Sequence, residues 1–248
     1  MIKQIRFENI SEFTRYLDKN KNVIASESAS SRYDEDRWAG TTNWAEFEQL
    51  IQNGDDEITK EIRKWTQYYI DKFEELYAES IGWQFDVVGQ FFDIGAVLVG
   101  EPEAWLNEIV VKDDKFIKLK INGVYPAKTD TSKVRRNASK VFGIAVALEK
   151  QGYLVEIDME YRTENPYKNG DIEVTIPVKT YNSPLDYKKF GILLNVAFFR
   201  RGIFRLLEIE CGKELRSGYG RTKRVEGDIQ LDNEQQVDDL ENKLREVA

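Results

Sequence analysis

The chain has 248 residues, a mass of 28.9 kDa, no histidine, one cysteine and a formal net charge of −8. The lack of histidine excludes a Ser-His-Asp triad, a Cys-His pair and histidine-ligated metal, and one cysteine excludes an internal disulfide or a thiolate zinc cluster. Any chemistry must therefore use carboxylates, lysine, arginine, tyrosine or hydroxyl groups.

The N-terminal part of the sequence is predicted to be mainly helical. IKQIRF at the start alternates in the manner of a short strand, and a helix is expected over 11–19. A polar, Ser-rich surface loop over 25–43 separates it from a second helix over 43–53. Apolar residues then repeat at intervals of three and four, which predicts a long helix over 55–81. The glycine-rich, apolar stretch 83–110 mixes strand signals with tight turns.

From residue 114 onward, strands and helices alternate. The expected order is strand 114–123, helix 133–151, strand 153–161, polar turn 162–170, strand 171–180, helix 184–208, a possible fourth strand Leu206–Cys211, and an acidic helix or frayed tail over 232–248. Hydroxyl side chains are the expected N-caps of the helices: Ser11, Thr41 or Thr42, Thr131 or Ser132, and Ser183. This order predicts an α/β fold, or an α+β fold, in which the loop after the first strand is the usual place for a ligand.

Charge is distributed unevenly and suggests three parts. Residues 1–110 carry 11 Lys and Arg against 22 Asp and Glu, residues 111–224 carry 23 against 14, and residues 225–248 carry 2 against 8. We therefore expect an acidic, mainly helical N-terminal part, a basic α/β part and an acidic tail. The acidic and basic parts either dock on each other or leave a basic binding surface.

Three stretches carry a resemblance to a known family: 38–54 (WAGTTNWAEFEQLIQNG), 85–105 with its glycines, and 135–156, which runs from RRNA to YLVE. With this spacing the chain resembles a family of phage- and prophage-encoded proteins of unknown function. The resemblance implies a bacteriophage source and the cytoplasm of a bacterial host. It brings no catalytic residues and no cofactor.

The part from residue 114 also resembles a degenerate von Willebrand factor A domain. A strand, a loop and a helix that ends ALEKQGY (147–153) precede the next strand. The resemblance implies a Rossmann-like sheet with flanking helices, on which the N-terminal part would pack. It also implies a metal-binding Asp-x-Ser-x-Ser loop, but Asn122 stands where the aspartate would be and the serines are absent, so we expect the metal site to be lost. A shifted site at 129–132 (TDTS) is the alternative.

Basic residues of the α/β part are the candidate binding surface. They are Arg135, Arg136, Lys140, Arg200, Arg201, Arg205, Arg216, Arg221, Lys223 and Arg224, with Tyr219 as a stacking aromatic. If they converge, they would bind the phosphates of a nucleic acid. The alternative is that Arg135 and Arg136 neutralise the acidic N-terminal part.

Three carboxylates on one predicted strand are a second candidate. Glu156, Asp158 and Glu160 share one face because side chains alternate along a strand, and such a cluster can hold Mg²⁺ in a nuclease, with Lys213 nearby. The competing interpretation is a solvated strand face, or a face that pairs with Lys118 and Lys120 on the neighbouring strand. No phosphate-binding loop or dinucleotide fingerprint is present in the sequence.

Together these patterns favour a non-enzymatic binding or adaptor protein that engages a macromolecule, either protein or nucleic acid, through its basic α/β part. A nucleic-acid-binding protein, an adaptor of an AAA+ ATPase and a metal-dependent nuclease are the alternatives. No apolar run is long enough to span a bilayer, so we expect no membrane partner, and no motif calls for a cofactor.

Overall fold

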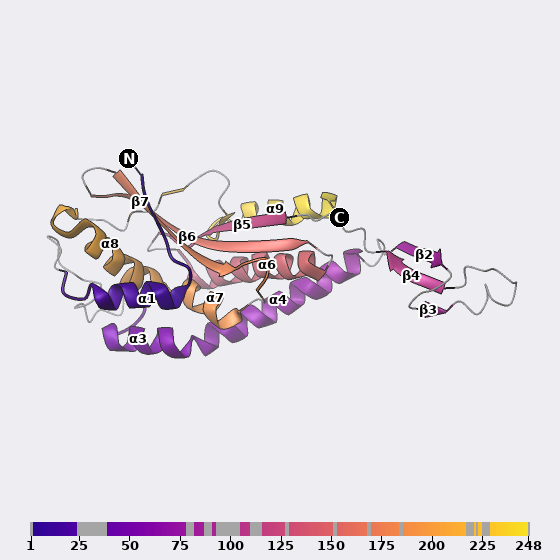
Figure 1. The fold of residues 1–248 in the computed structure, drawn as a ribbon, viewed down its shortest axis with the longest axis horizontal. Coiled ribbons are helices and arrows are strands. Elements are labelled where there is room, and N and C mark those ends of the chain that lie inside the picture. Colours follow the sequence, from indigo (N-terminus) through magenta and orange to yellow (C-terminus); the bar gives the residue numbers. More distant parts are fainter. Residues whose placement is uncertain are drawn as a thin grey trace, which may run out of the picture.

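The computed structural model describes residues 2–23, 39–77, 82–86, 91–92, 105–109, 116–126, 129–150, 153–167, 170–183, 186–216, 221, 223–224 and 229–247. These residues form a mixed α/β fold with a five-stranded main sheet, helices packed on it and a separate three-stranded sheet. Figure 1 shows this arrangement. The predicted α/β class is therefore confirmed.

The main sheet contains strands from both ends of the chain. Its strands are β1 (Ile2–Arg6), β5 (Phe116–Asn122), β6 (Leu154–Tyr167), β7 (Gly170–Lys179) and β8 (Ile229–Gln230), in the order β1-β7-β6-β5-β8. Only β6 and β7 are antiparallel; the other neighbours are parallel. The β6–β7 hairpin extends to Tyr167 and Gly170, so the polar turn expected over 162–170 is wrong, because Arg162, Thr163 and Tyr167 pair with residues of β7.

The helices follow the predicted order, with one exception. They are α1 (Ile10–Lys19), α3 (Trp44–Asn53), α4 (Asp56–Tyr77), α6 (Thr131–Lys150), α7 (Tyr187–Leu194), the π-helix η2 (Phe198–Ile203), α8 (Phe204–Cys211), the short 3₁₀ helix η3 (Gly212–Glu214) and α9 (Glu234–Val247). The fourth strand expected at Leu206–Cys211 is wrong, because those residues continue the helix that starts in η2. The strand that pairs with β5 at this edge is β8.

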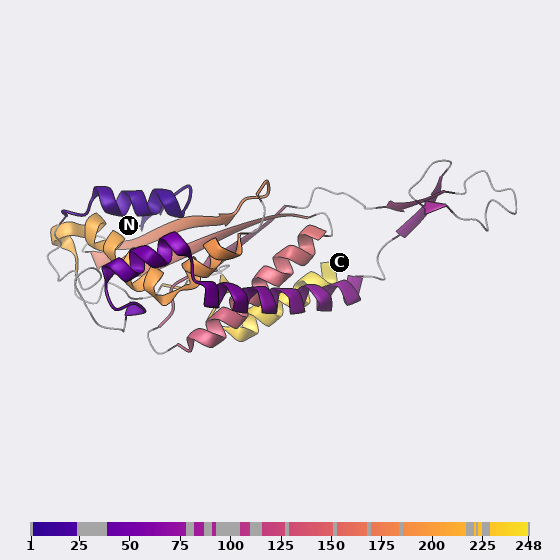
Figure 2. The same ribbon diagram turned by 90° about the horizontal axis from the view of Figure 1, so that it is seen from below.

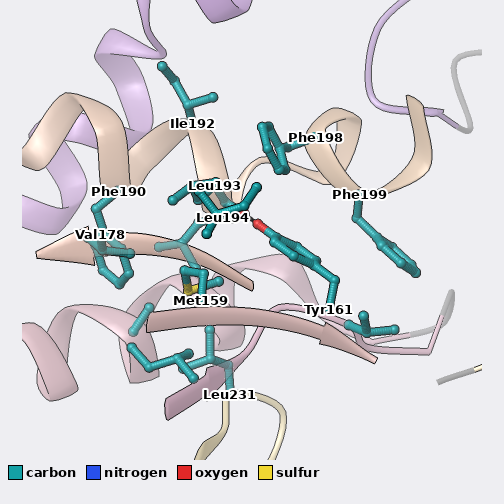
Figure 3. Close-up of a cluster of buried hydrophobic side chains, with 14 of the residues drawn as sticks. Met159, Tyr161, Val178, Phe190, Ile192, Leu193, Leu194, Phe198, Phe199 and Leu231 are labelled. Carbon is teal, nitrogen blue, oxygen red and sulfur yellow. Dashed lines mark hydrogen bonds between the residues drawn. The ribbon is translucent and has the colours of Figure 1, made fainter. Parts of the chain in front are cut away.

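One side of the main sheet faces the hydrophobic core. Met159 and Tyr161 of β6 point toward α7 and η2, where Phe190, Leu193 and Phe198 meet them (Figure 3). The Tyr161 hydroxyl donates a 2.8 Å hydrogen bond to the carbonyl of Leu193. Each large apolar side chain buried in this way contributes roughly 1.5–3 kcal/mol.

The N-terminal helices share this core with the α/β part. Phe13 of α1 lies with its ring centroid 5.0 Å from that of Phe198, and Phe47 of α3 and Ile62 of α4 are also fully buried in the same cluster. Helices α1, α3 and α4 of the acidic N-terminal part therefore share one core with the helices that cover the sheet.

Helices α4 and α6 approach closely at Gly143. A Cβ atom at this position would lie 2.6 Å from Cβ of Tyr69 and 3.3 Å from the carbonyl oxygen of Thr66. We expect Gly143→Val to lower the free energy of unfolding by about 1–3 kcal/mol, because the backbones must separate. Urea denaturation measures this change. Lys64→Val on the exposed side of α4 is the control and should cost at most about 0.7 kcal/mol, so equal losses would contradict the close approach.

The apolar stretch after α4 forms its own small sheet. Strands β2 (Gly82–Asp86), β4 (Trp105–Ile109) and β3 (Phe91–Phe92) pair antiparallel in the order β2-β4-β3. In Figures 1 and 2 this sheet lies beyond the end of α4, apart from the main sheet. Among the described residues, no helix is long and apolar enough to cross a membrane.

Candidate binding surface on the main sheet

The side of the main sheet opposite the core is lined by charged residues. Along β6, Ile157, Met159 and Tyr161 point into the core, and the residues that alternate with them point the other way. We call this side the charged face: Arg6, Lys118, Lys120, Glu156, Asp158, Glu160, Arg162, Asp171, Glu173 and Lys223. Its members come from four strands and from the segment that follows α8.

The three candidate metal-binding carboxylates lie on this face and are paired with lysines of β5. Lys118 Nζ is 2.9 Å from Asp158 and 3.3 Å from Glu156, and Lys120 Nζ is 3.6 Å from Glu160. The interpretation that these carboxylates pair with Lys118 and Lys120 is therefore confirmed.

Further cations from the other strands complete this network. Arg6 of β1 lies 2.9 Å from Asp158, while Arg162 contacts Glu160 on its own strand and Glu173 of β7 at 2.6 Å. Burial raises the pKa of Asp158, but hydrogen bonds from Arg6 and Lys118 outweigh it, so the pKa lies below its ordinary value. Because its neighbours already neutralise this carboxylate, a divalent cation would have to displace two ion pairs to bind it.

The positive and negative groups of the charged face lie at different depths. The side chains of Arg6, Lys118 and Lys120 are 54%, 42% and 45% exposed, whereas those of Asp158, Glu160 and Glu173 are 1%, 6% and 10% exposed. Asp158, Glu160 and Glu173 therefore lie beneath the amino and guanidinium groups of Arg6, Lys118 and Lys120. Arg162 is buried with these carboxylates at 8% exposed, and Glu156 is partly exposed at 26%. A partner that approaches this face therefore meets positive charge first.

Two exposed aromatic residues lie at one end of the charged face. Phe116 precedes Lys118 by two positions on β5, so it is on the same side of the sheet, and Tyr181 follows the end of β7. Their ring centroids are 5.9 Å apart, edge to face, and both rings are among the most exposed large apolar groups of the described residues. Exposed aromatic rings of this kind commonly mark contact surfaces.

The segment 216–224 brings more cations to the other end of β5. Its described residues lie at the edge of β6 beyond the end of β5: the backbone nitrogens of Arg216 and Lys223 donate to carbonyls of β6, and the Arg221 carbonyl accepts from another residue of that strand. Lys223 Nζ is 2.5 Å from Asp171 on the charged face, and Arg224 pairs with Asp232 at 2.6 Å. Arg216 and Arg221 are exposed. These four candidates lie together, and Tyr219 lies outside the described residues.

The candidate cations on α6 contact other helices instead. Arg135 lies 3.4 Å from Glu61 of α4, and the Arg136 guanidinium lies over the Trp65 ring at 5.7 Å. Lys140 pairs with Asp238 and Glu241 of α9, the latter at 2.6 Å. The Arg135 contact matches the alternative in which the cations of this helix neutralise the N-terminal part, whereas Arg136 is exposed and contacts an aromatic ring of that part rather than a carboxylate.

The candidates on η2 and α8 lie in the interior or beside it. Arg201 is fully buried and donates hydrogen bonds to the side chain and carbonyl of Thr41 at 2.6 and 2.7 Å. Arg205 is buried beside Glu208. Arg200 is half-buried, and burial lowers its pKa. The ten predicted cations therefore do not form one continuous surface.

The side chain of Asn122, at the end of β5, has a structural role. Its Nδ2 donates to Gln230 Oε1 at 3.0 Å and to the Lys223 carbonyl at 3.1 Å, and its Oδ1 accepts from the Val124 backbone at 3.0 Å. Asp130, in the alternative site, accepts hydrogen bonds from both the hydroxyl and the backbone nitrogen of Ser132, which hold its pKa low. Both side chains are already used to hold the loop between β5 and α6.

We expect Asn122→Asp to destabilise the protein by about 2–4 kcal/mol, because it buries a carboxylate facing two acceptors that now receive hydrogen bonds. Thermal unfolding with and without Mg²⁺ measures the effect. Asn182→Asp, at an exposed turn, is the control. A variant that is as stable as the parent, or that Mg²⁺ stabilises strongly, would contradict this structural role.

Sequence reasoning did not find Arg6, Phe116 or Tyr181. The alternation FIKLK contains a local signal for Phe116, because it places that ring in line with Lys118 and Lys120. Arg6 has no such signal, since it reaches Asp158 only through the pairing of β1 with β7.

Comparison with known proteins gives one match. The model of a family described as Domain of unknown function (DUF7192) matches residues 2–248, so the chain belongs to this family. No curated protein and no solved structure matches the chain.

Proposed function

We propose that this member of the DUF7192 family is a non-enzymatic binding protein that engages a negatively charged macromolecule through its charged face. The observation that carries the proposal is the depth difference on that face, where exposed cations cover buried carboxylates. Such layering gives an attractive outer potential even though the ion pairs beneath it are neutral overall.

The same contacts favour binding over metal-dependent cleavage. Glu156, Asp158 and Glu160 each lie within 3.6 Å of a lysine nitrogen. The described residues contain no group of three Asp, Glu or Cys side chains arranged to hold a metal ion. A Mg²⁺ site on β6 would need the whole network to rearrange.

We propose further that β5 to α9 are a degenerate A-type domain from a bacteriophage protein that acts in the cytoplasm of the host. The succession of β5, α6 and the parallel strand β6, with β8 on the other side of β5, supports this fold assignment. Asn122 at the end of β5 supports the loss of its metal site.

A binding assay at two salt concentrations tests the proposal. We expect heparin, DNA or RNA to bind at low salt and to bind less at moderate salt, and we expect Lys118→Gln/Lys120→Gln to weaken that binding. Lys64→Gln on α4 is the matched control, because it removes one exposed lysine from the helical side. If none of these polyanions binds in a salt-sensitive manner, the proposal is wrong.

A further inference from the structure

We infer that the partner of the charged face is a single-stranded nucleic acid, whose phosphates follow β5 and whose bases stack on Phe116 and Tyr181. This inference rests on the proposed function, and it moves the nucleic-acid contact away from α6, η2 and α8, where sequence reasoning placed part of it. Its basis is the way one strand arranges an aromatic residue and cations in a row.

The row follows from the two-residue period of a strand. Phe116, Lys118 and Lys120 project from the same side of β5 at intervals of about 6.6 Å, because each residue advances a strand by about 3.3 Å. Beyond Asn122, whose side chain holds the Lys223 carbonyl at 3.1 Å, the exposed Arg221 adds a further cation, while the Lys223 amino group turns toward Asp171 of β7. An extended polyanion therefore finds positive charge along its length.

The carboxylates do not cancel this row at the surface. Asp158 and Glu160 lie beneath the lysines and are nearly inaccessible to solvent. Their role is to hold the ammonium groups in place, so less side-chain entropy is lost when a phosphate binds. Lys118 is held in this way by two carboxylates, Glu156 and Asp158.

The aromatic pair distinguishes an unpaired strand from a duplex or an acidic protein. Phe116 and Tyr181 support each other edge to face, and both rings remain largely exposed. Base stacking on aromatic rings requires open base faces, which single strands offer and duplexes cover. An acidic protein could form ion pairs with the lysines, but it has no bases to stack on the two aromatic rings.

Fluorescence anisotropy with labelled oligonucleotides tests the inference. The probes are an oligothymidylate of about 20 nucleotides, which exceeds the roughly 4–16 nucleotides that one OB fold covers, and a mixed-sequence duplex of similar length. We expect Phe116→Ala/Tyr181→Ala to weaken binding of the single strand about tenfold without changing the salt slope. We expect Lys118→Gln/Lys120→Gln to reduce the slope of log K against log salt by about 1.4.

Matched variants separate these effects from loss of structure. Tyr68→Ala removes an exposed ring from α4, and Lys64→Gln removes an exposed lysine from the same helix; neither should change binding. Phe116→Leu keeps apolar bulk without a ring and should bind as weakly as Phe116→Ala. Circular dichroism and the Tm of each variant report whether the sheet is intact.

The outcomes distinguish this inference from the proposed function. If the duplex or heparin binds as tightly as the oligothymidylate and the aromatic variants have no effect, the single-strand inference is wrong and the proposed function stands. If polyglutamate binds and the oligonucleotides do not, the single-strand inference is again wrong and the proposed function again stands. If no polyanion shows salt-sensitive binding, both are wrong.

Discussion

Replacing Arg205 by methionine is expected to lower the free energy of unfolding by about 3–5 kcal/mol. This guanidinium is buried in α8, where Nη1 is 3.1 Å from the Glu208 carboxylate. Nη2 donates to three carbonyls in the turn after α1, at 3.3, 3.1 and 2.9 Å: those of Asn20, Lys21 and Val23. Methionine fills a similar volume but leaves a fully buried carboxylate without its guanidinium and three carbonyls without this donor.

A double variant separates the charge effect from loss of packing. Arg205→Met/Glu208→Leu removes both charges, and it should be more stable than Arg205→Met because the buried carboxylate that has lost the Arg205 guanidinium is removed as well. Lys213→Met on the neighbouring η3 removes an exposed cation and should change stability by less than about 0.5 kcal/mol. Urea denaturation of the four proteins measures these differences. If the double variant is less stable than Arg205→Met, the explanation by loss of the buried Arg205–Glu208 ion pair is wrong.

Buried arginines also show why the basic surface predicted from sequence is only partly formed. Counting cations in a window treats Arg200, Arg201 and Arg205 as surface residues, because arginine is rarely buried. In the structure the window is helical and packs on the sheet, so two of these residues serve internal contacts to Thr41 and Glu208. Which arginines are internal depends on how the N-terminal segment packs, and that long-range packing has no local signature.

Local patterns predicted the elements themselves well but misplaced their boundaries. Period-two alternation indicated β5 and the first part of β6, and the helix over 133–151 corresponds to α6. The expected hydroxyl N-caps are wrong: four helices begin with side-chain acceptors that are amides or carboxylates, namely Asn9, Asn43, Asp130 and Asp186. These residue types accept hydrogen bonds from helix N–H groups at least as well as Ser and better than Thr.

The charged face could not be predicted in full, because it depends on strand pairings between residues that lie far apart in the sequence. The β5–β6 portion of this face was predictable, because the alternation of side chains on two neighbouring strands indicated that Glu156, Asp158 and Glu160 pair with two lysines. The Arg6 contribution depends on β1 adding to β7, which joins opposite ends of the chain. Such distant parallel pairing is decided by the global fold rather than by local propensity.

The second large effect concerns the pH dependence of stability, and it comes from the contact between α9 and the helical layer. Glu241 is buried between Lys140 of α6 and Lys72 of α4, whose amino groups lie 2.6 and 3.0 Å from its carboxylate. Burial raises the pKa of Glu241, but hydrogen bonds from the two lysines outweigh it and lower the pKa from 4.5 to about 2. Because the folded pKa is depressed, the stabilisation is complete above the unfolded value of 4.5 and is lost as the pH falls from there toward 2.

Glu241→Gln should therefore be less stable than the parent by about 2 kcal/mol at pH 7, after allowance for solvent screening, and the difference should shrink steadily below pH 4.5. Urea denaturation of both proteins at several pH values between 7 and 3 measures it. Glu234→Gln, an exposed residue in the first turn of α9, is the control and should show no comparable trend. A difference that stays constant with pH would mean that the loss of stability does not come from the charge of this carboxylate. A difference that vanishes on acidification assigns the acidic C-terminal helix a structural role as an ion-paired part of the fold.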